Sequence, residues 1–137
     1  MNNSLQIIRQ AVLDFWPEHE RYIDSSLGSL TDDELSDISH LANLLLSVSE
    51  GALSQHIEGY KWTCDRILEE ELFFRREGRY RCSSISEVEN QVYSRPEIMM
   101  PYINGLALSQ ILWANHAKVF SYYRRHFIGK SSSKWHV

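Results

Sequence analysis

The stretch ALSQHIEGYKWTCDRILEEELFFRREG, residues 52–78, decides the fold class. Its apolar side chains recur at steps of three and four residues, which is the spacing of one face of an α-helix. They are Leu53, Ile57, Tyr60, Cys64, Ile67, Leu68, Leu72 and Phe73. Gly78 follows the last of these positions, where a glycine commonly ends a helix. We therefore predict a long helix over about residues 52–77, in which Gly59 marks a close packing contact or a kink.

The sequence on both sides of this stretch carries the same helical pattern. Thr31–Glu34 and Ser84–Glu87 match the capping box, in which a hydroxyl and a glutamate three residues later satisfy the first backbone amides of a helix. Apolar side chains return at steps of three and four residues after Pro101. They predict a second long helix over about residues 102–127.

The predicted fold is therefore all-α. No segment alternates polar and apolar residues as a half-buried strand does. We expect a compact bundle in which the helices over 52–77 and 102–127 are the long members and several short helices complete the core. A chain of 137 residues suggests one domain, so residues 1–128 are interpreted as one helical domain and residues 129–137 as a polar C-terminal tail.

Composition and charge narrow the classes of function. The net charge of −4 argues against nucleic-acid binding through overall basicity, and the basic pair Arg124–Arg125 is interpreted as complementing the dipole at a helix C-terminus. No run approaches the roughly 20 apolar residues of a membrane-spanning helix, and the first residues lack a signal-peptide pattern. Two cysteines are too few for a disulfide framework. We therefore expect a cytoplasmic protein with no membrane or nucleic-acid partner.

The sequence lacks the motifs of metal, nucleotide and covalent chemistry. Helical di-iron sites need Glu-x-x-His pairs, which are missing, and only part of the run Glu69–Glu71 can face one side of a helix. No glycine-rich loop follows a strand, and no Gly-x-Ser-x-Gly motif is present. We expect no metal site and no complete active site in this chain.

The best candidates for binding chemistry are polar and aromatic residues of the predicted long helices. His116 lies among apolar positions, where it is either a core residue or a general base in a pocket between helices. Gln110 lies close to the same apolar stripe and therefore needs a hydrogen-bond partner. Tyr60, Trp62 and Trp113 offer aromatic walls for such a pocket, and plain core packing is the alternative for each of them.

Several strings that occur in order give the sequence a family resemblance. They are GYKWTCD (59–65), EEELFFRREGRYR (69–81), VYS (92–94), MPYINGLALSQ (100–110) and LWANH (112–116). From Asp33 to Phe127 the chain resembles the N-terminal helical region of bacterial class I S-adenosylmethionine-dependent methyltransferases of natural-product pathways. In that family the helical region commonly covers the substrate pocket and helps to form a dimer, and a following Rossmann-like domain holds the cofactor.

The sequence departs from that family after Phe127. Ten residues follow, and they contain neither the strand nor the glycine-rich turn nor the ribose-binding acid of a cofactor domain. The resemblance therefore implies a non-catalytic helical subunit that completes, caps or regulates the substrate pocket of a separate methyltransferase. This chain alone is expected to bind no cofactor, and S-adenosylmethionine would be held through the partner.

Two other functions remain as alternatives. One is a stand-alone homodimeric helical module that binds a small molecule or a peptide, which the density of Trp and Tyr favours. The other is a small helical enzyme that uses Glu70 and His116. The residues expected to line a pocket or an interface are Tyr60, Trp62, Glu70, Tyr102, Asn104, Gln110, Trp113 and Asn115, with His116 as the catalytic candidate.

Overall fold

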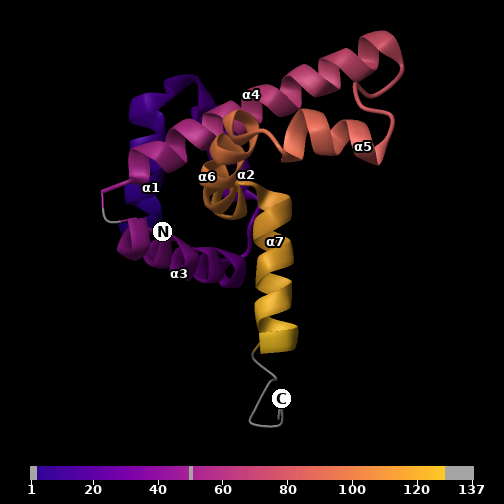
Figure 1. Cartoon of the computed structure of the whole chain (residues 1–137). Coiled ribbons are helices and arrows are strands. Elements are labelled where there is room, and N and C mark those ends of the chain that lie inside the picture. Colours follow the sequence, from indigo (N-terminus) through magenta and orange to yellow (C-terminus); the bar gives the residue numbers. More distant parts are fainter. Residues whose placement is uncertain (1–2, 50, 129–137) are drawn as a thin grey trace, which may run out of the picture. The chain divides into compact units, whose positions relative to one another are not determined.

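The regular elements of the protein are helices (Figure 1). The computed structural model describes residues 3–49 and 51–128, and over these residues it contains no strand, which confirms the all-α prediction. None of the helices in these two ranges is both long enough and apolar enough to cross a membrane. In chain order the elements are α1 (Asn3–Phe15), η1 (Pro17–His19), α2 (Glu20–Gly28), α3 (Asp32–Ser49), α4 (Leu53–Glu77), α5 (Ile85–Val88), η2 (Glu89–Tyr93), α6 (Pro96–Leu112), α7 (Ala114–Tyr123) and η3 (Arg124–Ile128).

The described residues form two compact units. The first unit contains residues 3–49 and 109–128, and the second contains residues 51–108, so the boundary between them falls within α6. The sequence suggested one helical domain over residues 1–128, whereas residues 51–108 pack mainly against one another. The polar tail expected over residues 129–137 lies outside the described residues.

Aliphatic side chains from several helices form the core of the first unit. α3 packs against α1 and against α7. The capping box predicted at the start of α3 is confirmed: the Thr31 amide donates to Glu34 Oε2 over 2.9 Å, and the Glu34 amide donates to Thr31 Oγ1 over 3.3 Å. The side chains of this core that are fully buried are Leu5, Ile8, Val12, Ile23, Ile38, Ala42, Ile111, Leu112 and Ala117.

The second unit is built on α4, which confirms the helix predicted over 52–77. Gly78 ends α4 in the left-handed conformation with φ of 67°, and its amide donates to the Phe74 carbonyl over 2.8 Å. Glycine adopts this conformation without the steric cost of a side chain. The chain then turns back, and α5 and η2 follow the predicted capping box at Ser84 and end at Tyr93.

Two glycines let α4 and α6 cross with their backbones in contact. A Cβ atom added to Gly59 would lie 2.8 Å from the Gly105 nitrogen and 2.9 Å from Asn104 Cβ, and it would also meet the Pro101 carbonyl oxygen. A Cβ atom added to Gly105 would lie 2.5 Å from both the carbonyl carbon and the carbonyl oxygen of Gly59. Of the two alternatives predicted for Gly59, a close packing contact or a kink, the structure shows the close contact, and its partner is Gly105.

The second predicted long helix, over 102–127, is interrupted. α6 begins earlier, at Pro96, and ends at Leu112, and Trp113 has an extended conformation before α7 begins at Ala114. The Ser26 hydroxyl donates to the buried Leu112 carbonyl over 2.6 Å. This bond satisfies a carbonyl that the helix break leaves without its intrahelical partner. The break therefore depends on a residue 86 positions away.

The basic pair after α7 has a more specific role than complementing a helix dipole. Arg125 Nε lies 2.7 Å from Asp37 Oδ2, and Arg124 pairs with the other oxygen of the same carboxylate. The Ser121 hydroxyl donates to Asp37 Oδ2 over 2.6 Å. Asp37 is buried on α3, so these contacts connect the end of α7 and the start of η3 to α3.

A buried imidazole lies near the start of α2. The His19 ring stacks on Trp16 with the ring centroids 3.9 Å apart, and on Tyr22 with the centroids 4.8 Å apart. The His19 side chain is 8% exposed, and burial lowers its pKa below the usual value of 6.5. The folded protein therefore holds His19 in the neutral form at pH values where the unfolded chain already binds a proton.

The free energy of unfolding is consequently expected to fall as the pH is lowered from 7 through 6.5 toward the depressed pKa of His19. Urea titrations at a series of pH values measure this slope. His19→Phe keeps an aromatic ring in the stack and should make the slope shallower. His40→Gln, at an exposed position of α3, is the control for loss of an imidazole. An equal slope in the wild type and in His19→Phe would contradict the prediction.

Candidate ligand-binding groove

Two adjoining cavities form a groove in the second unit. One has a volume of about 500 Å³ and the other of about 270 Å³, and Arg66, Val92 and Ile98 line both. Sites for drug-sized ligands usually have volumes of about 300–1,000 Å³. The first cavity is completed by Glu70, Tyr80, Arg81, Cys82, Val88 and Gln91, and the second by Trp62, Thr63, Ile67, Tyr93, Met99 and Tyr102.

The smaller cavity is the apolar end of the groove. Trp62 and Ile67 reach it from α4, and Met99 and Tyr102 reach it from the first turns of α6. Trp62 is half-buried, and the guanidinium of Arg66 lies 5.3 Å from the centre of its ring system. Two of the predicted pocket residues, Trp62 and Tyr102, therefore lie in the same cavity although 40 residues separate them.

The larger cavity carries the charged side chains of the groove. Arg81 Nε donates to Glu70 Oε1 over 2.7 Å, and the Arg81 guanidinium lies 4.2 Å from the centre of the Phe73 ring. Arg66 pairs with Glu69 over 3.1 Å. The turn at Gly78 makes the Arg81 contact possible, because it brings the chain back along the last turns of α4.

Hydrogen bonds at the start of α5 hold the segment that closes this end of the groove. The Glu87 amide donates to Ser84 Oγ over 3.2 Å, as the capping box predicts. The Glu87 carboxylate accepts from the amide and the hydroxyl of Ser83, one residue earlier than the pattern implies. These bonds, with the Ser83 amide as the largest contributor, lower the pKa of Glu87 below its ordinary value of 4.5.

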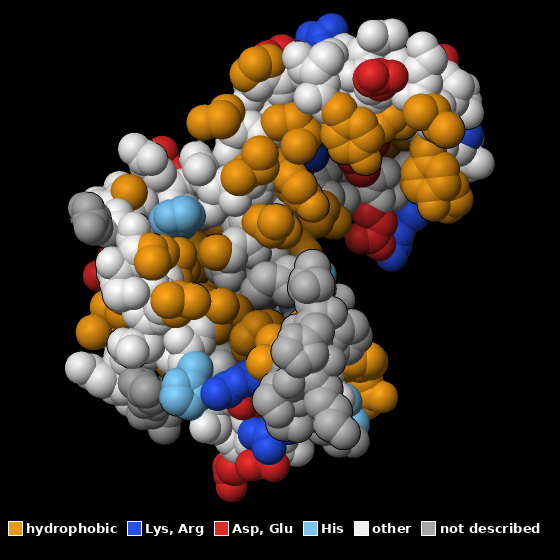
Figure 2. All heavy atoms as spheres, turned by 60° about the horizontal axis from the view of Figure 1, so that its bottom comes forward, with side chains coloured by type: hydrophobic (Ala, Val, Ile, Leu, Met, Phe, Trp, Pro, Cys, Tyr) orange, Lys and Arg blue, Asp and Glu red, His pale blue; other side chains and the backbone are white. Residues whose placement is uncertain are grey.

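Apolar side chains are exposed around the groove as well as within it. Figure 2 shows hydrophobic side chains gathered over α4 and α5. On α4 the exposed members are Ile67, Leu68 and Leu72, and Ile85 of α5 is 86% exposed. Contiguous apolar surface of this kind marks binding sites more often than isolated apolar residues do.

His116 and its neighbours lie in the first unit. Gln110 Nε2 lies 3.1 Å from His116 Nδ1, so the partner that Gln110 was predicted to need is this imidazole. The Trp113 ring lies 4.9 Å from the His116 ring. In the tautomer with the ring proton on Nε2, the Gln110 amide N–H donates to Nδ1 and occupies its lone pair.

The remaining candidate residues have structural contacts of other kinds. Tyr60 is fully buried and lines neither cavity of the groove. The Asn104 carbonyl oxygen lies 2.7 Å from His56 Nδ1, and Asn104 Cβ lies at the glycine crossing. Asn115 is exposed on the first turn of α7. Glu70 and His116 belong to different units, and each has the local partner described above.

The groove also contains residues that the sequence analysis did not single out, above all Arg66, Arg81 and Ile98. One sequence feature pointed to Arg81, because it follows the helix-ending glycine by three residues and can therefore fold back on α4. Arg66 pairs with Glu69 on the same helix, and it shares the cavity with Ile98, which comes from another helix.

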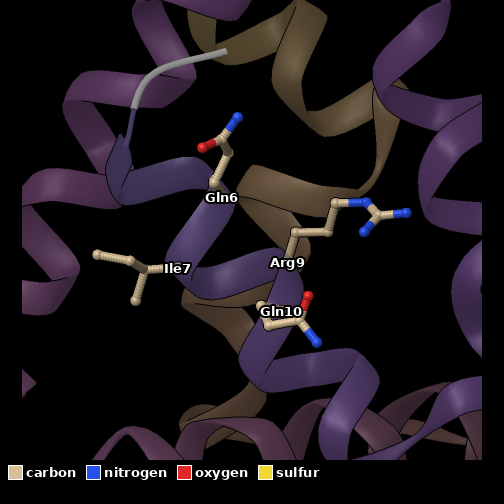
Figure 3. Close-up of a pocket in the computed structure, with 4 residues that line it drawn as sticks. All are labelled: Gln6, Ile7, Arg9 and Gln10. Carbon is tan, nitrogen blue, oxygen red and sulfur yellow. The ribbon is translucent and has the colours of Figure 1, made fainter.

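A second hollow, on α1, is a weaker candidate. Figure 3 shows that Gln6, Ile7, Arg9 and Gln10 line it, all from one helix, with side chains that diverge. Arg9 is held by ion pairs with Glu20 and Asp24. Among the described residues, no group of three or more His, Cys, Asp or Glu side chains is placed to hold a metal ion. The groove of the second unit is therefore the better site.

Comparison of the chain with models of protein families, with curated proteins and with solved structures finds no match. The fit of S-adenosylmethionine can still be tested against the residues themselves. Class I enzymes hold it at the ends of parallel strands beside a glycine-rich turn. Residues 3–49 and 51–128 contain no such strand.

Proposed function

We propose that this chain is a non-catalytic helical subunit that binds an apolar small-molecule substrate for a separate S-adenosylmethionine-dependent methyltransferase. The groove of the second unit carries the proposal. It combines aromatic walls, a volume suited to a small molecule and a few polar groups at one end, which is the usual composition of ligand sites. The methyltransferase partner is proposed from the sequence resemblance of residues 33–127.

The binding half of the proposal can be tested with this chain alone. N-phenyl-1-naphthylamine is a neutral aromatic probe that fluoresces in apolar sites, and we expect it to bind the wild type. Trp62→Ala should weaken the binding about tenfold, since a large side chain contributes on the order of 1.5–3 kcal/mol when it is fully covered and Trp62 is only partly covered. Tyr122→Ala, an exposed aromatic residue on α7, is the control. A dissociation constant unaffected by Trp62→Ala would contradict binding in this groove.

The partner half requires a methylation assay. A class I methyltransferase that lacks its own helical region and co-purifies with this chain is supplied with S-adenosylmethionine labelled in the methyl group. We expect methyl transfer to a small-molecule acceptor to require this chain and to fall when Trp62→Ala replaces the wild type. A partner that is fully active without this chain would overturn the subunit proposal.

A stand-alone homodimeric binding module is the second candidate, and the exposed apolar side chains of α4 favour it. A second copy of the chain could cover Ile67, Leu68 and Leu72, and light scattering measures the resulting mass. Under this candidate the neutral probe binds and the protein is a dimer, but no methyltransferase depends on it. Probe binding by a monomer that activates a methyltransferase would exclude it.

A further inference from the structure

We infer that the groove selects small molecules that carry a carboxylate on an aromatic or other apolar body. This inference rests on the proposed function, because it names the chemical class of the ligand that the same groove would take. The apolar end would hold the body of the ligand, and Arg81 would hold its carboxylate.

The charged side chains that line the groove favour a negative ligand. They are Arg66, Arg81 and Glu70, so two of the three charged side chains on its walls are positive, although Arg66 also pairs with Glu69. Arg79 adds a further positive charge nearby, because its guanidinium lies 5.6 Å from the centre of the same Phe73 ring that Arg81 covers. Glu70 and Arg81 line the larger cavity only, Trp62, Tyr93 and Tyr102 line the smaller cavity, and Arg66 lies between them and lines both. A ligand that matches both ends is amphipathic and anionic.

Arg81 has the donors that a carboxylate needs. Within the described part of the chain its one hydrogen-bonded partner is Glu70, which occupies Nε. The two terminal nitrogens of the guanidinium are left for another acceptor. Arginine binds carboxylates through parallel N–H groups in a planar fork, a geometry that a lysine ammonium cannot reproduce. The Arg81 guanidinium lies over the Phe73 ring, 4.2 Å from its centre, and this contact restricts where the fork can move.

Glu70 acts as an internal competitor for this donor. Its carboxylate already holds Arg81, and its side chain lines the same cavity. A ligand carboxylate that approaches Arg81 therefore meets both an attractive cation and a repulsive anion. Removing the charge of Glu70 should release Arg81 and tighten the binding of anionic ligands, without changing the binding of neutral ones. A response of the anionic ligand alone distinguishes recognition of charge from simple burial of apolar surface.

The test compares two probes that share one aromatic body. N-phenyl-1-naphthylamine is neutral, and 8-anilinonaphthalene-1-sulfonate is the same molecule with an anionic group. We expect the wild type to bind the anionic probe about fivefold more tightly, which is the factor of an exposed ion pair. Arg81→Gln should abolish this preference, and Glu70→Gln should enlarge it severalfold. Naphthalene-1-carboxylate should displace the bound sulfonate at lower concentration than naphthalene-1-carboxamide does.

Arg76→Gln is the matched control. Arg76 also lies over Phe73, with its guanidinium 5.9 Å from the ring centre, but it pairs with Glu77 and lines neither cavity. We expect it to leave both affinities unchanged. Binding of the neutral probe reports whether each variant keeps its fold. If Arg81→Gln loses its fold, the affinity of Glu70→Gln for the anionic probe decides whether the groove prefers anionic ligands.

The outcomes separate the two proposals. If neither probe binds the wild type, the proposed function fails. If both probes bind with equal affinity and the affinities do not respond to Arg81→Gln or Glu70→Gln, the proposed function stands and the preference for carboxylates is overturned.

Discussion

Replacing Gly59 by alanine is expected to destabilise the second unit by about 3 kcal/mol, near the upper end of the usual cost of overpacking. The added methyl group would meet backbone atoms of α6, including the Gly105 nitrogen at 2.8 Å, and a backbone cannot rotate away as a long side chain can. Alanine favours a helix over glycine by about 1 kcal/mol, so the substitution would stabilise α4 if the crossing were looser. A destabilising effect of Gly59→Ala therefore indicates a tight backbone contact, and a stabilising effect indicates a looser crossing.

Urea unfolding followed by circular dichroism measures this effect, and hydrogen exchange of α4 and α6 locates it. Gly105→Ala should cost a similar amount, because its added carbon lies 2.5 Å from the Gly59 carbonyl carbon. Gly28→Ala is the control, since no atom lies within 4 Å of a Cβ added there. A stabilising effect of Gly59→Ala would show that the two helices are farther apart.

The elements that the sequence predicts well are those whose causes are local. The start of α3 is fixed by Thr31 and Glu34, three residues apart, and the end of α4 by Gly78. Periodic apolar side chains show that the intervening residues are helical. The break at Trp113 could not be predicted in the same way, because the bond from Ser26 to the Leu112 carbonyl joins residues 86 positions apart.

The candidate site shows the same division. The aromatic residues Trp62 and Tyr102 could be singled out from the sequence, since large aromatic side chains favour pockets and interfaces. Their arrangement in one cavity depends on the crossing at Gly59 and Gly105, which the sequence indicated only as a close contact of unknown partner. The role of Arg81 depends on the path of the chain after Gly78, and no periodic pattern reports such a turn.

Loss of Asp37 should strongly destabilise the first unit. Its side chain is 4% exposed, and it accepts hydrogen bonds from Ser121, Arg124 and Arg125. Asp37→Ala is expected to lower the free energy of unfolding by about 3 kcal/mol, because breaking a buried ion pair leaves its partners without an acceptor. This loss lies at the low end of the usual range because both arginines are partly exposed and can form hydrogen bonds with water in the variant.

Two further substitutions separate charge from hydrogen bonding. Asp37→Asn keeps an oxygen for the Ser121 hydroxyl and removes the charge. It should therefore lower the free energy of unfolding less than Asp37→Ala does. Asp33→Ala removes a carboxylate that also pairs with Arg125, over 3.1 Å, but whose side chain is 76% exposed. An exposed pair of this kind contributes less than about 1 kcal/mol. Equal costs for Asp33→Ala and Asp37→Ala would contradict the central role of the buried carboxylate.

The pH dependence gives an independent check on the same carboxylate. Burial raises the pKa of Asp37, but the hydrogen bonds from Arg125 and Ser121 and the charges of both arginines lower it more, so the pKa lies below its usual value of 3.8. Stability from a carboxylate with a depressed pKa is complete above the unfolded pKa and is lost as the pH falls through the folded pKa. We therefore expect Asp37→Ala to differ most from the wild type above about pH 4, and the difference to shrink on acidification. The loss that His19 causes begins at higher pH, as the pH falls through 6.5, because that is the usual value from which its pKa is lowered.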